Sequence, residues 1–216
     1  MLKKPPKPKT EHQREYLRSL HHNKITFCDG PAGTGKTFLS TLTGILGLME
    51  GKYHKIIISR PLVQSGEDTG YLPGGINDKL DPYMQPIQDV LEHFLSPNVL
   101  EDYRQNKQIE IVPFAYMRGR NFFKSYIILD EVQNCSYPQL LLALTRFAKG
   151  STMVLTGDLN QSDLPESKQG AMKTIMDKLQ DTKDIGIIKL DNSDIIREPI
   201  VKTILEKLNG TSETPG

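Results

Sequence analysis

The sequence predicts an α/β fold with a doubly wound, mainly parallel sheet in three layers, αβα. Short apolar runs recur along the chain and alternate with segments whose apolar residues have helical spacing. Strands that alternate with helices are typical of a parallel sheet covered by helices on both faces. A glycine-rich turn follows the first run and an acidic pair follows a later one. Both are expected at the carboxyl ends of strands, where open α/β sheets bind ligands.

The expected strands are runs of apolar residues, and the expected helices have apolar residues at intervals of three and four. Thr10 fits the N-cap of the first helix, with Gln13 three residues on as in a capping box. Arg60 and Pro61 end the second strand, and the glycines and prolines over 62–76 predict a loop. The strands are expected over residues 25–28, 55–59, 109–113, 126–129, 152–156 and 185–190, and the helices over 10–20, 38–43, 78–95, 100–107, 138–148, 168–179 and 198–208.

The composition, 37% hydrophobic and 25% charged, fits one globular domain, which we expect over residues 10–208. Residues 1–9 mix lysine with proline and predict a flexible basic arm, either a solvated tail or a contact for phosphates. The polar residues 209–216 predict a flexible tail. No apolar run is long enough to span a bilayer, and the first residues lack the apolar core of a secretory signal. We therefore expect a cytoplasmic protein with no membrane partner.

The chain is organised around the stretch GPAGTGKT, residues 30–37. Backbone N–H groups of such a turn wrap around a phosphate, and the N-terminus of the following helix adds a favourable dipole. Lys36 is expected to reach the β- and γ-phosphates of ATP, and the Thr37 hydroxyl to bind Mg²⁺. The expected nucleotide-binding residues are Gly30, Pro31, Ala32, Gly33, Thr34, Gly35, Lys36, Thr37 and Phe38.

An acidic pair, Asp130 and Glu131, follows the expected strand 126–129. Asp130 fits the carboxylate that holds Mg²⁺ together with Thr37. Glu131 fits the residue that orients the attacking water and partly deprotonates it. We expect the first and fourth strands to end side by side, with the metal between the glycine-rich loop and the acidic pair.

Three further residues have two interpretations each. Gln13 either caps the first helix or reads the edge of adenine. Gln161, beyond the strand 152–156, either bonds the γ-phosphate or the attacking water, or only solvates its loop. Arg197 follows the last strand and either forms a surface ion pair or completes the site of a neighbouring subunit in a ring. An arginine at the γ-phosphate contributes about 10³–10⁵ in rate.

The chain resembles the PhoH family of P-loop ATPases, which are related to the core of superfamily 1 helicases. The resemblance covers residues 10–207 and implies a RecA-like P-loop NTPase that hydrolyses ATP, an RNA-linked activity such as RNA helicase activity, and a homo-oligomer, a hexameric ring. Glu198 stands where the family often has histidine. The resemblance is carried by the glycine-rich loop, by Arg60-Pro61, by residues 70–74 (GYLPG), by residues 113–120 (PFAYMRGR), by residues 130–134 (DEVQN), by residues 156–158 (TGD) with Gln161, and by residues 194–197 (DIIR).

The net charge is only +1, so a nucleic acid has to be held by a local basic patch. The candidates for contacting single-stranded RNA, or DNA, are Arg60, Tyr71, Arg118 and Arg120. They combine positive charge with an aromatic ring, as grooves that follow a single strand do. Ordinary loop packing is the alternative for these residues.

Two other functions stay open. A nucleotide switch or scaffold would bind the nucleotide without hydrolysing it and without nucleic acid. A small-molecule kinase would use the same glycine-rich loop, although the acidic pair favours water as the acceptor. The later strands are not followed by an Asn-Lys-x-Asp sequence that reads guanine, which favours ATP over GTP.

Overall fold

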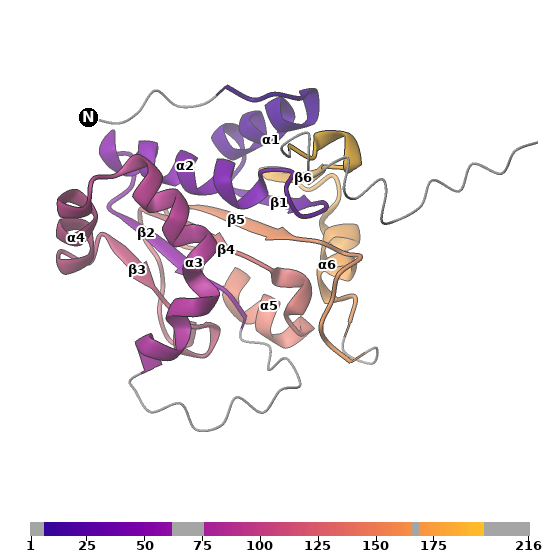
Figure 1. Ribbon diagram of the computed structural model, residues 1–216. Coiled ribbons are helices and arrows are strands. Elements are labelled where there is room, and N and C mark those ends of the chain that lie inside the picture. Colours follow the sequence, from indigo (N-terminus) through magenta and orange to yellow (C-terminus); the bar gives the residue numbers. More distant parts are fainter. Residues whose placement is uncertain (1–6, 62–75, 166–168, 197–216) are drawn as a thin grey trace, which may run out of the picture.

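The computed structural model describes residues 7–61, 76–165 and 169–196 (Figure 1). These residues form a six-stranded sheet with the order β3-β2-β4-β5-β1-β6, and all of its strand pairs are parallel. The sheet confirms the predicted α/β class. Its strands are β1 (Ile25–Asp29), β2 (Lys55–Ser59), β3 (Ile109–Ile111), β4 (Ser125–Leu129), β5 (Thr152–Gly157) and β6 (Ile185–Lys189).

The described helices lie close to their predicted ranges, with shifts at their ends. α4 begins before the expected residue 100 because Pro97 follows the N-cap Ser96, and proline suits the first turn of a helix. α5 ends at Leu144 rather than at residue 148. Within the described ranges no helix is both long and apolar enough to cross a membrane. The helices are α1 (Glu11–His22), α2 (Lys36–Met49), α3 (Ile76–Phe94), α4 (Pro97–Gln105), α5 (Tyr137–Leu144) and α6 (Ala171–Leu179), with the short 3₁₀ helices η1 (Phe114–Met117), η2 (Val132–Asn134) and η4 (Asn192–Asp194).

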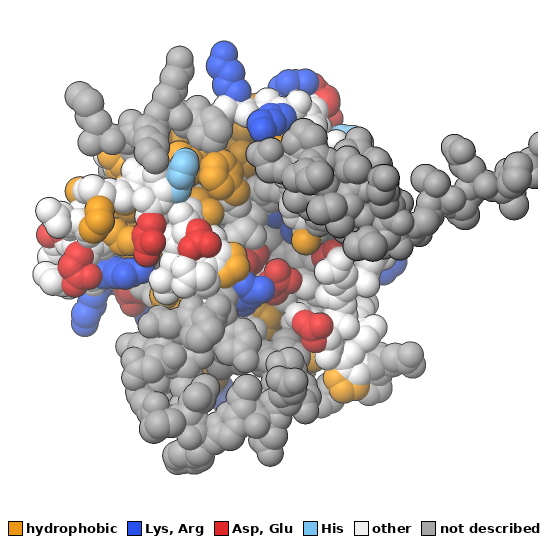
Figure 2. Space-filling model, in the orientation of Figure 1, with side chains coloured by type: hydrophobic (Ala, Val, Ile, Leu, Met, Phe, Trp, Pro, Cys, Tyr) orange, Lys and Arg blue, Asp and Glu red, His pale blue; other side chains and the backbone are white. Residues whose placement is uncertain are grey.

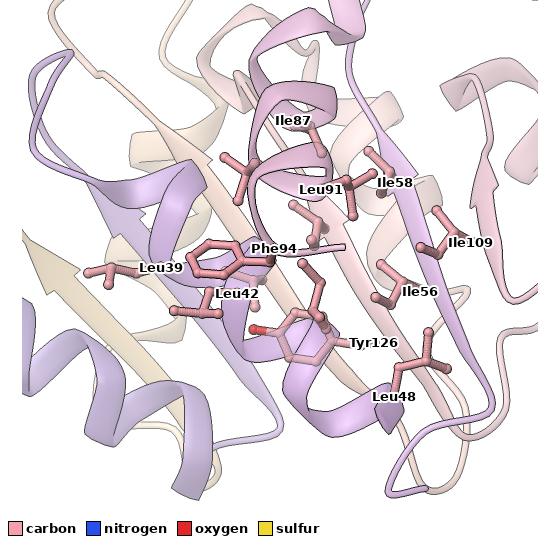
Figure 3. Packing of buried hydrophobic residues seen from close by; sticks show 14 of the residues in the cluster. Leu39, Leu42, Leu48, Ile56, Ile58, Ile87, Leu91, Phe94, Ile109 and Tyr126 are labelled. Carbon is pink, nitrogen blue, oxygen red and sulfur yellow. The ribbon is translucent and has the colours of Figure 1, made fainter. Parts of the chain in front are cut away.

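Helices cover both faces of the sheet (Figure 1), and alternate residues of each strand point to opposite faces. Ile56 and Ile58 of β2 pack in a cluster with side chains of α1, α2 and α3, which Figure 3 shows from close by. Ile57, between them, packs in a second cluster with side chains of α5 and α6. Burial on both faces explains why the strands are continuous apolar runs.

Helix α2 approaches the sheet closely at Gly44. A Cβ atom there would lie 2.7 Å from Cδ1 of Tyr126, a fully buried residue of β4. The glycine therefore lets the helix that follows the glycine-rich loop rest directly on the central strand.

The prediction that the first and fourth strands lie side by side is wrong. β5 lies between β1 and β4, and Leu155 of β5 is in register with Phe27 on one side and Leu129 on the other. Strand order depends on how the crossovers pass over the sheet, which the apolar runs do not encode. The site therefore includes the end of β5 as well as the ends of β1 and β4.

Several predictions fall on residues outside the described ranges. The loop over 62–75 with Tyr71, the residue Arg197, the helix 198–208 and the tail 209–216 all lie there. Of the basic arm, only Lys7, Pro8 and Lys9 are described.

Candidate nucleotide site

The glycine-rich loop joins β1 to α2, as predicted, and packs tightly against the end of β6. A Cβ atom on Gly30 would lie 2.7 Å from the carbonyl oxygen of Leu190 and 2.8 Å from its Cβ, so a larger residue does not fit. The N–H of Gly30 donates to the carbonyl of Gly157 at the end of β5 (3.1 Å). Gly35, just before α2, has a φ of 88°, in the region that favours glycine. The loop is thus fixed by strands on both sides of β1.

The Lys36 ammonium lies against the loop itself. It donates hydrogen bonds to the carbonyls of Gly30 (2.5 Å) and Pro31 (2.8 Å). The Thr34 hydroxyl also donates to Pro31 (2.8 Å). These contacts keep a positive charge at the loop, where its N–H groups and the N-terminus of α2 favour an anion.

The predicted metal pair is brought together. The Thr37 hydroxyl donates to Oδ1 of Asp130 at 3.0 Å, and Asp130 is 3% exposed. The hydroxyl of Thr156, the fully buried penultimate residue of β5, donates a short hydrogen bond to the same oxygen. Thr156 therefore occupies the gap between β1 and β4 and fixes the carboxylate. A hydroxyl and a carboxylate are oxygen ligands of the kind that Mg²⁺ prefers.

Glu131 is held between two side chains. Its backbone is left-handed (φ 55°, ψ 39°), and its Oε1 lies 3.2 Å from Nη2 of Arg60. Its Oε2 accepts a hydrogen bond of 2.5 Å from Nε2 of Gln133. Gln133 is 5% exposed, and its Oε1 accepts the N–H of Asp158 at 3.2 Å. Arg60, predicted as a contact for nucleic acid, thus lies beside Glu131.

The loops that follow β4 and β5 are joined by further hydrogen bonds. Asn134 and Asp163 bond reciprocally: Nδ2 of Asn134 donates to Oδ2 of Asp163, and the N–H of Asp163 donates to Oδ1 of Asn134, both at 2.8 Å. The Ser162 hydroxyl donates to the carbonyl of Gln133 (3.2 Å). Gln161 lies in this joined loop, with its N–H on the carbonyl of Asp158 (3.1 Å) and its side chain exposed. The glutamine that contacts Glu131 is Gln133, and the role of Gln161 at the γ-phosphate or the attacking water stays a prediction.

The backbone of Gln13 takes part in the N-cap of α1, and its side chain contacts the glycine-rich loop. The Thr10 hydroxyl does accept the N–H of Gln13 (3.1 Å), which confirms the N-cap. The Gln13 side chain does not close the capping box, because its Oε1 accepts the N–H of Lys9 (2.8 Å) and its Nε2 donates to the carbonyl of Thr34 (2.9 Å). Gln13 is 3% exposed and links the start of α1 to the glycine-rich loop.

A cavity of about 300 Å³ opens beside this link. It extends from the glycine-rich loop to the first turn of α2, where the half-buried Phe38 packs against Phe94, with 5.5 Å between ring centroids and the rings tilted by 54°. Its lining residues are Lys7, Lys9, Gln13, Gly33, Gly35, Phe38, Leu39 and Ile196.

The segment beyond β6 also returns to the loop. The N–H of Ile196 donates to the carbonyl of Gly33 (3.1 Å). Asp194, which is fully buried, accepts from the N–H of Asp191 and from Nδ1 of His12 on α1, both at 2.8 Å. The hydrogen bond with Asp194 raises the pKa of His12 above its ordinary value. Residues just before Arg197 are thereby fixed to both α1 and the glycine-rich loop.

The two described arginines near η1 differ in their surroundings. Arg118 is exposed. Arg120 donates to Oε2 of Glu110 (2.9 Å) and lies over the ring of Phe122, 4.9 Å from its centroid. Burial favours a raised pKa for Glu110, but hydrogen bonds from Lys55 and Arg120 outweigh it and lower the pKa. Arg120 therefore makes packing contacts at the edge strand β3, and its predicted contact with nucleic acid stays a prediction.

Sequence reasoning missed Gln133 and Thr156 as site residues. Gln133 stands two residues after Glu131, so an amide so close to the acidic pair is a signal that could have found it. Thr156 is the polar end of an apolar strand, where side chains reach the ligand edge of a parallel sheet. The hydroxyl of Thr156 and the amide of Gln133 set the orientation of the two carboxylates.

Comparison with known proteins gives a family and a fold. The family model of the PhoH-like protein matches residues 6–209. A PhoH-like protein of Bacillus subtilis (strain 168) is 41% identical over 198 residues, which cover 92% of this chain and 62% of that protein. A PhoH-like protein from Synechocystis sp. is 37% identical, and the match covers 63% of that protein. Protein PhoH of Escherichia coli (strain K12) is 33% identical, and the match covers 56% of it. The chain thus spans about three fifths of the length of these curated relatives.

Among solved structures, the large terminase from a thermophilic bacteriophage, in complex with ADP, superimposes with a TM-score of 0.60 at 11% identity. The superposition covers 94% of this chain and 50% of the terminase. At this identity the likeness shows the fold alone. Because the family model covers nearly the whole chain and the relatives exceed 30% identity, the chain belongs to the PhoH-like protein family.

Proposed function

We propose that the protein is a Mg²⁺-dependent ATPase that hydrolyses ATP to ADP and phosphate. The observation that supports this most directly is the contact between Thr37, at the end of the glycine-rich loop, and the buried carboxylate of Asp130 (3.0 Å). Glu131 follows Asp130 in the chain and has its carboxylate oriented by Arg60 and Gln133. The ADP in the terminase of the same fold is consistent with a nucleotide in this chain.

In the proposed mechanism the N–H groups of the glycine-rich loop bind the phosphates, and the Lys36 ammonium transfers from the carbonyls of Gly30 and Pro31 to the β- and γ-phosphates. Thr37 and Asp130 would hold Mg²⁺, which would supply charge stabilisation to the transferred phosphoryl group. Glu131 accepts a proton from the water whose oxygen attacks the γ-phosphorus, while the bond from the γ-phosphorus to the bridging oxygen breaks and ADP leaves. Gln161 hydrogen-bonds the γ-phosphate or the attacking water when its exposed side chain turns toward them.

We further propose that hydrolysis is coupled to single-stranded RNA and takes place in a ring of copies, with Arg197 reaching the site of the next subunit. Arg118 and the 55%-exposed ring of Tyr116 offer charge and a stacking surface near one edge of the sheet. On the described part of the face in Figure 2, Lys and Arg side chains lie scattered among Asp and Glu. Binding would therefore rest on a few local contacts and weaken steeply with salt.

The test measures phosphate release from ATP and Mg²⁺, with and without single-stranded RNA, beside a mass measurement in the presence of ATP. Glu131→Gln is expected to retain ATP binding and to hydrolyse about 10²–10⁴-fold more slowly, because the general base is lost. Glu101→Gln on the exposed face of α4, where Glu101 accepts from Gln105 (2.9 Å), is the matched control and is expected to match the wild type.

Each competing function predicts a different product. Free phosphate supports the ATPase, and a phosphorylated metabolite in its place would show a kinase. Nucleotide binding with negligible turnover in the wild type would show a switch or scaffold. Turnover unaffected by RNA and by DNA would rule out the proposed coupling to nucleic acid. The mass of a single subunit, together with full turnover at high dilution, would rule out the proposed ring.

A further inference from the structure

The six strands all begin at one edge of the sheet, opposite the candidate nucleotide site, because every strand pair is parallel. We call this the amino edge. An exposed lysine stands within three residues before the start of each strand. In the order of the sheet, from β3 to β6, these residues are Lys107, Lys52, Lys124, Lys149, Lys24 and Lys183.

Backbone hydrogen bonds join the segments that carry these lysines. The N–H of His54 donates to the carbonyl of Lys124 (2.7 Å), and the N–H of Lys124 donates to the carbonyl of Lys149 (3.1 Å). The N–H of Met153 donates to the carbonyl of Lys24 (2.8 Å). Neighbouring strands lie about 4.8 Å apart, so the segments before three neighbouring strands span about 10 Å. The lysines before β2, β4, β5 and β1 therefore belong to one continuous surface.

Carboxylates neutralise one end of the amino edge. Nζ of Lys24 lies 2.7 Å from Oδ2 of Asp184, and Asp181 is exposed two residues before Lys183. At β3, Glu110 lies between two cations, Lys55 and Arg120.

The middle of the amino edge keeps its positive charge. Among the described residues, no carboxylate oxygen lies within 4.0 Å of the ammonium of Lys52, Lys124 or Lys149. The opposite edge carries Asp130, Glu131 and Asp158, which follow β4 and β5. The net charge of +1 thus conceals a separation of charge across the sheet, with a local basic patch before β2, β4 and β5.

An aromatic ring stands beside this patch. Phe123 is 62% exposed and directly precedes Lys124, whereas Phe122 is buried. Lys124 has a φ of 43°, which is uncommon for a residue other than glycine. A Cβ atom on Gly150 would lie 3.1 Å from Cγ of Lys124, so the glycine leaves room for the stem of the lysine beside Lys149.

We propose that the amino edge binds a single-stranded nucleic acid. The ammonium groups of Lys52, Lys124 and Lys149 contact successive phosphates, and the ring of Phe123 stacks on a base. Positive charge along a line together with an exposed ring is the combination that grooves for single strands use. A row of charges that crosses three strands fits a linear polyanion better than a compact acidic surface. This site is separate from the nucleotide site, and its binding requires neither ATP nor its hydrolysis.

The first experiment measures binding by the wild-type protein in the absence of nucleotide. Fluorescence anisotropy follows labelled oligouridine and oligothymidine of about 20 nucleotides, longer than a typical single-strand site, between about 50 and 200 mM salt. We expect binding that weakens steeply with salt, and binding of either RNA or DNA supports the proposal. A duplex of the same length, polyglutamate and phosphatidylserine vesicles are the comparison ligands. No binding of single strands at about 50 mM salt would overturn the proposal, and so would tighter binding of any comparison ligand.

The second experiment removes the charges and the ring. The double variant Lys124→Gln, Lys149→Gln should bind single strands about tenfold or more weakly at about 50 mM salt, with a salt slope shallower by about 1.4. Phe123→Ala should bind about 5- to 150-fold more weakly, the equivalent of one stacked base, with the slope unchanged. The double variant Lys173→Gln, Lys178→Gln on α6 changes the net charge equally at two exposed lysines and should match the wild type.

Two results of the second experiment would overturn the proposal. An equal loss of affinity in the α6 variant would show that only the net charge matters. A loss in Arg118→Gln with none in the lysine pair would place the strand near η1 instead. Urea unfolding verifies that each variant folds, and Lys52→Gln with Lys107→Gln replaces the first pair if that pair does not. Because no nucleotide is present, a protein without ATPase activity still tests this surface, and the ATPase can hold where this surface fails.

Discussion

Replacing Gln133 by methionine is expected to slow ATP hydrolysis while leaving ATP affinity nearly unchanged. Methionine keeps the length of the side chain and removes the amide. Nε2 of Gln133 donates to Glu131 at 2.5 Å, and Oε1 accepts the N–H of Asp158 at 3.2 Å, so the amide fixes Glu131 against the end of β5. Without it the carboxylate is oriented from the side of Arg60 (3.2 Å) but not from the side of β5.

The size of the effect follows from the charge on Glu131. A hydrogen bond to a charged group contributes about 1.5–3 kcal/mol. If that contribution is made in the transition state alone, kcat falls about 10- to 150-fold. The buried N–H of Asp158 also loses its partner, which costs about 1–3 kcal/mol in the free energy of unfolding.

The assay follows phosphate release against ATP concentration, together with urea unfolding. A positioning role predicts a lower kcat with an unchanged KM, because the contact acts after binding. Gln105→Met, on the exposed face of α4, serves as control. Normal turnover by a folded Gln133→Met protein would refute the reasoning, and so would an equal loss in the control.

Three other substitutions test separate contacts. Thr156→Val removes a hydroxyl that donates to the buried Asp130 and should lower the free energy of unfolding by about 1.5–3 kcal/mol in urea, whereas Thr156→Ser keeps the donor and should lose less. Gly30→Ala places a Cβ atom 2.7 Å from a carbonyl beyond β6; it should cost about 1–3 kcal/mol in the same assay and weaken nucleotide binding in calorimetry. The hydrogen bond with Asp194 raises the pKa of His12, so protonated His12 stabilises the fold below its ordinary pKa of 6.5, and this is lost as the pH rises through the raised value. The stability difference between wild type and His12→Asn should therefore be larger in acid than in alkali.

Each of these expectations has a contrary result. Equal unfolding free energies for the valine and serine variants at Thr156 would mean that its hydroxyl does not support Asp130. A Gly30→Ala protein with wild-type stability would mean that β6 moves aside. If the difference in unfolding free energy between wild type and His12→Asn does not change with pH, the ion pair of His12 with Asp194 does not contribute to stability.

Local patterns were enough to predict most of the fold. The apolar runs and the helical spacing gave the six described strands and the described helices, because burial on both faces of a parallel sheet leaves continuous apolar segments. The local patterns did not predict the order of the strands in the sheet. β5 lies between β1 and β4, and the residues 152–157 do not indicate which strands they pair with.

The candidate site divides in the same way. The glycine-rich loop and the acidic pair are each a short continuous stretch of sequence, so the chemistry of each could be predicted from the sequence. The contact between Thr37 and Asp130 agrees with that prediction. One partner of Glu131 comes from a distant segment, and the other, two residues away, is itself bonded to a distant segment. Arg60 is 71 positions away, and Gln133 connects to Asp158, 25 positions on. Contacts of this length depend on strand order and side-chain direction, which is why Gln133 was not predicted as a site residue.

Both flanks of the chain meet at one turn of backbone. The amide of Gln13 fastens Thr34 from the amino-terminal side, and the N–H of Ile196 fastens Gly33 from the carboxyl-terminal side. Loss of either hydrogen bond would release a peptide unit of the loop, so the amide hydrogens at Thr34 and Gly35 should exchange faster. Their exchange rates would thus report how firmly Gln13 and Ile196 hold the glycine-rich loop.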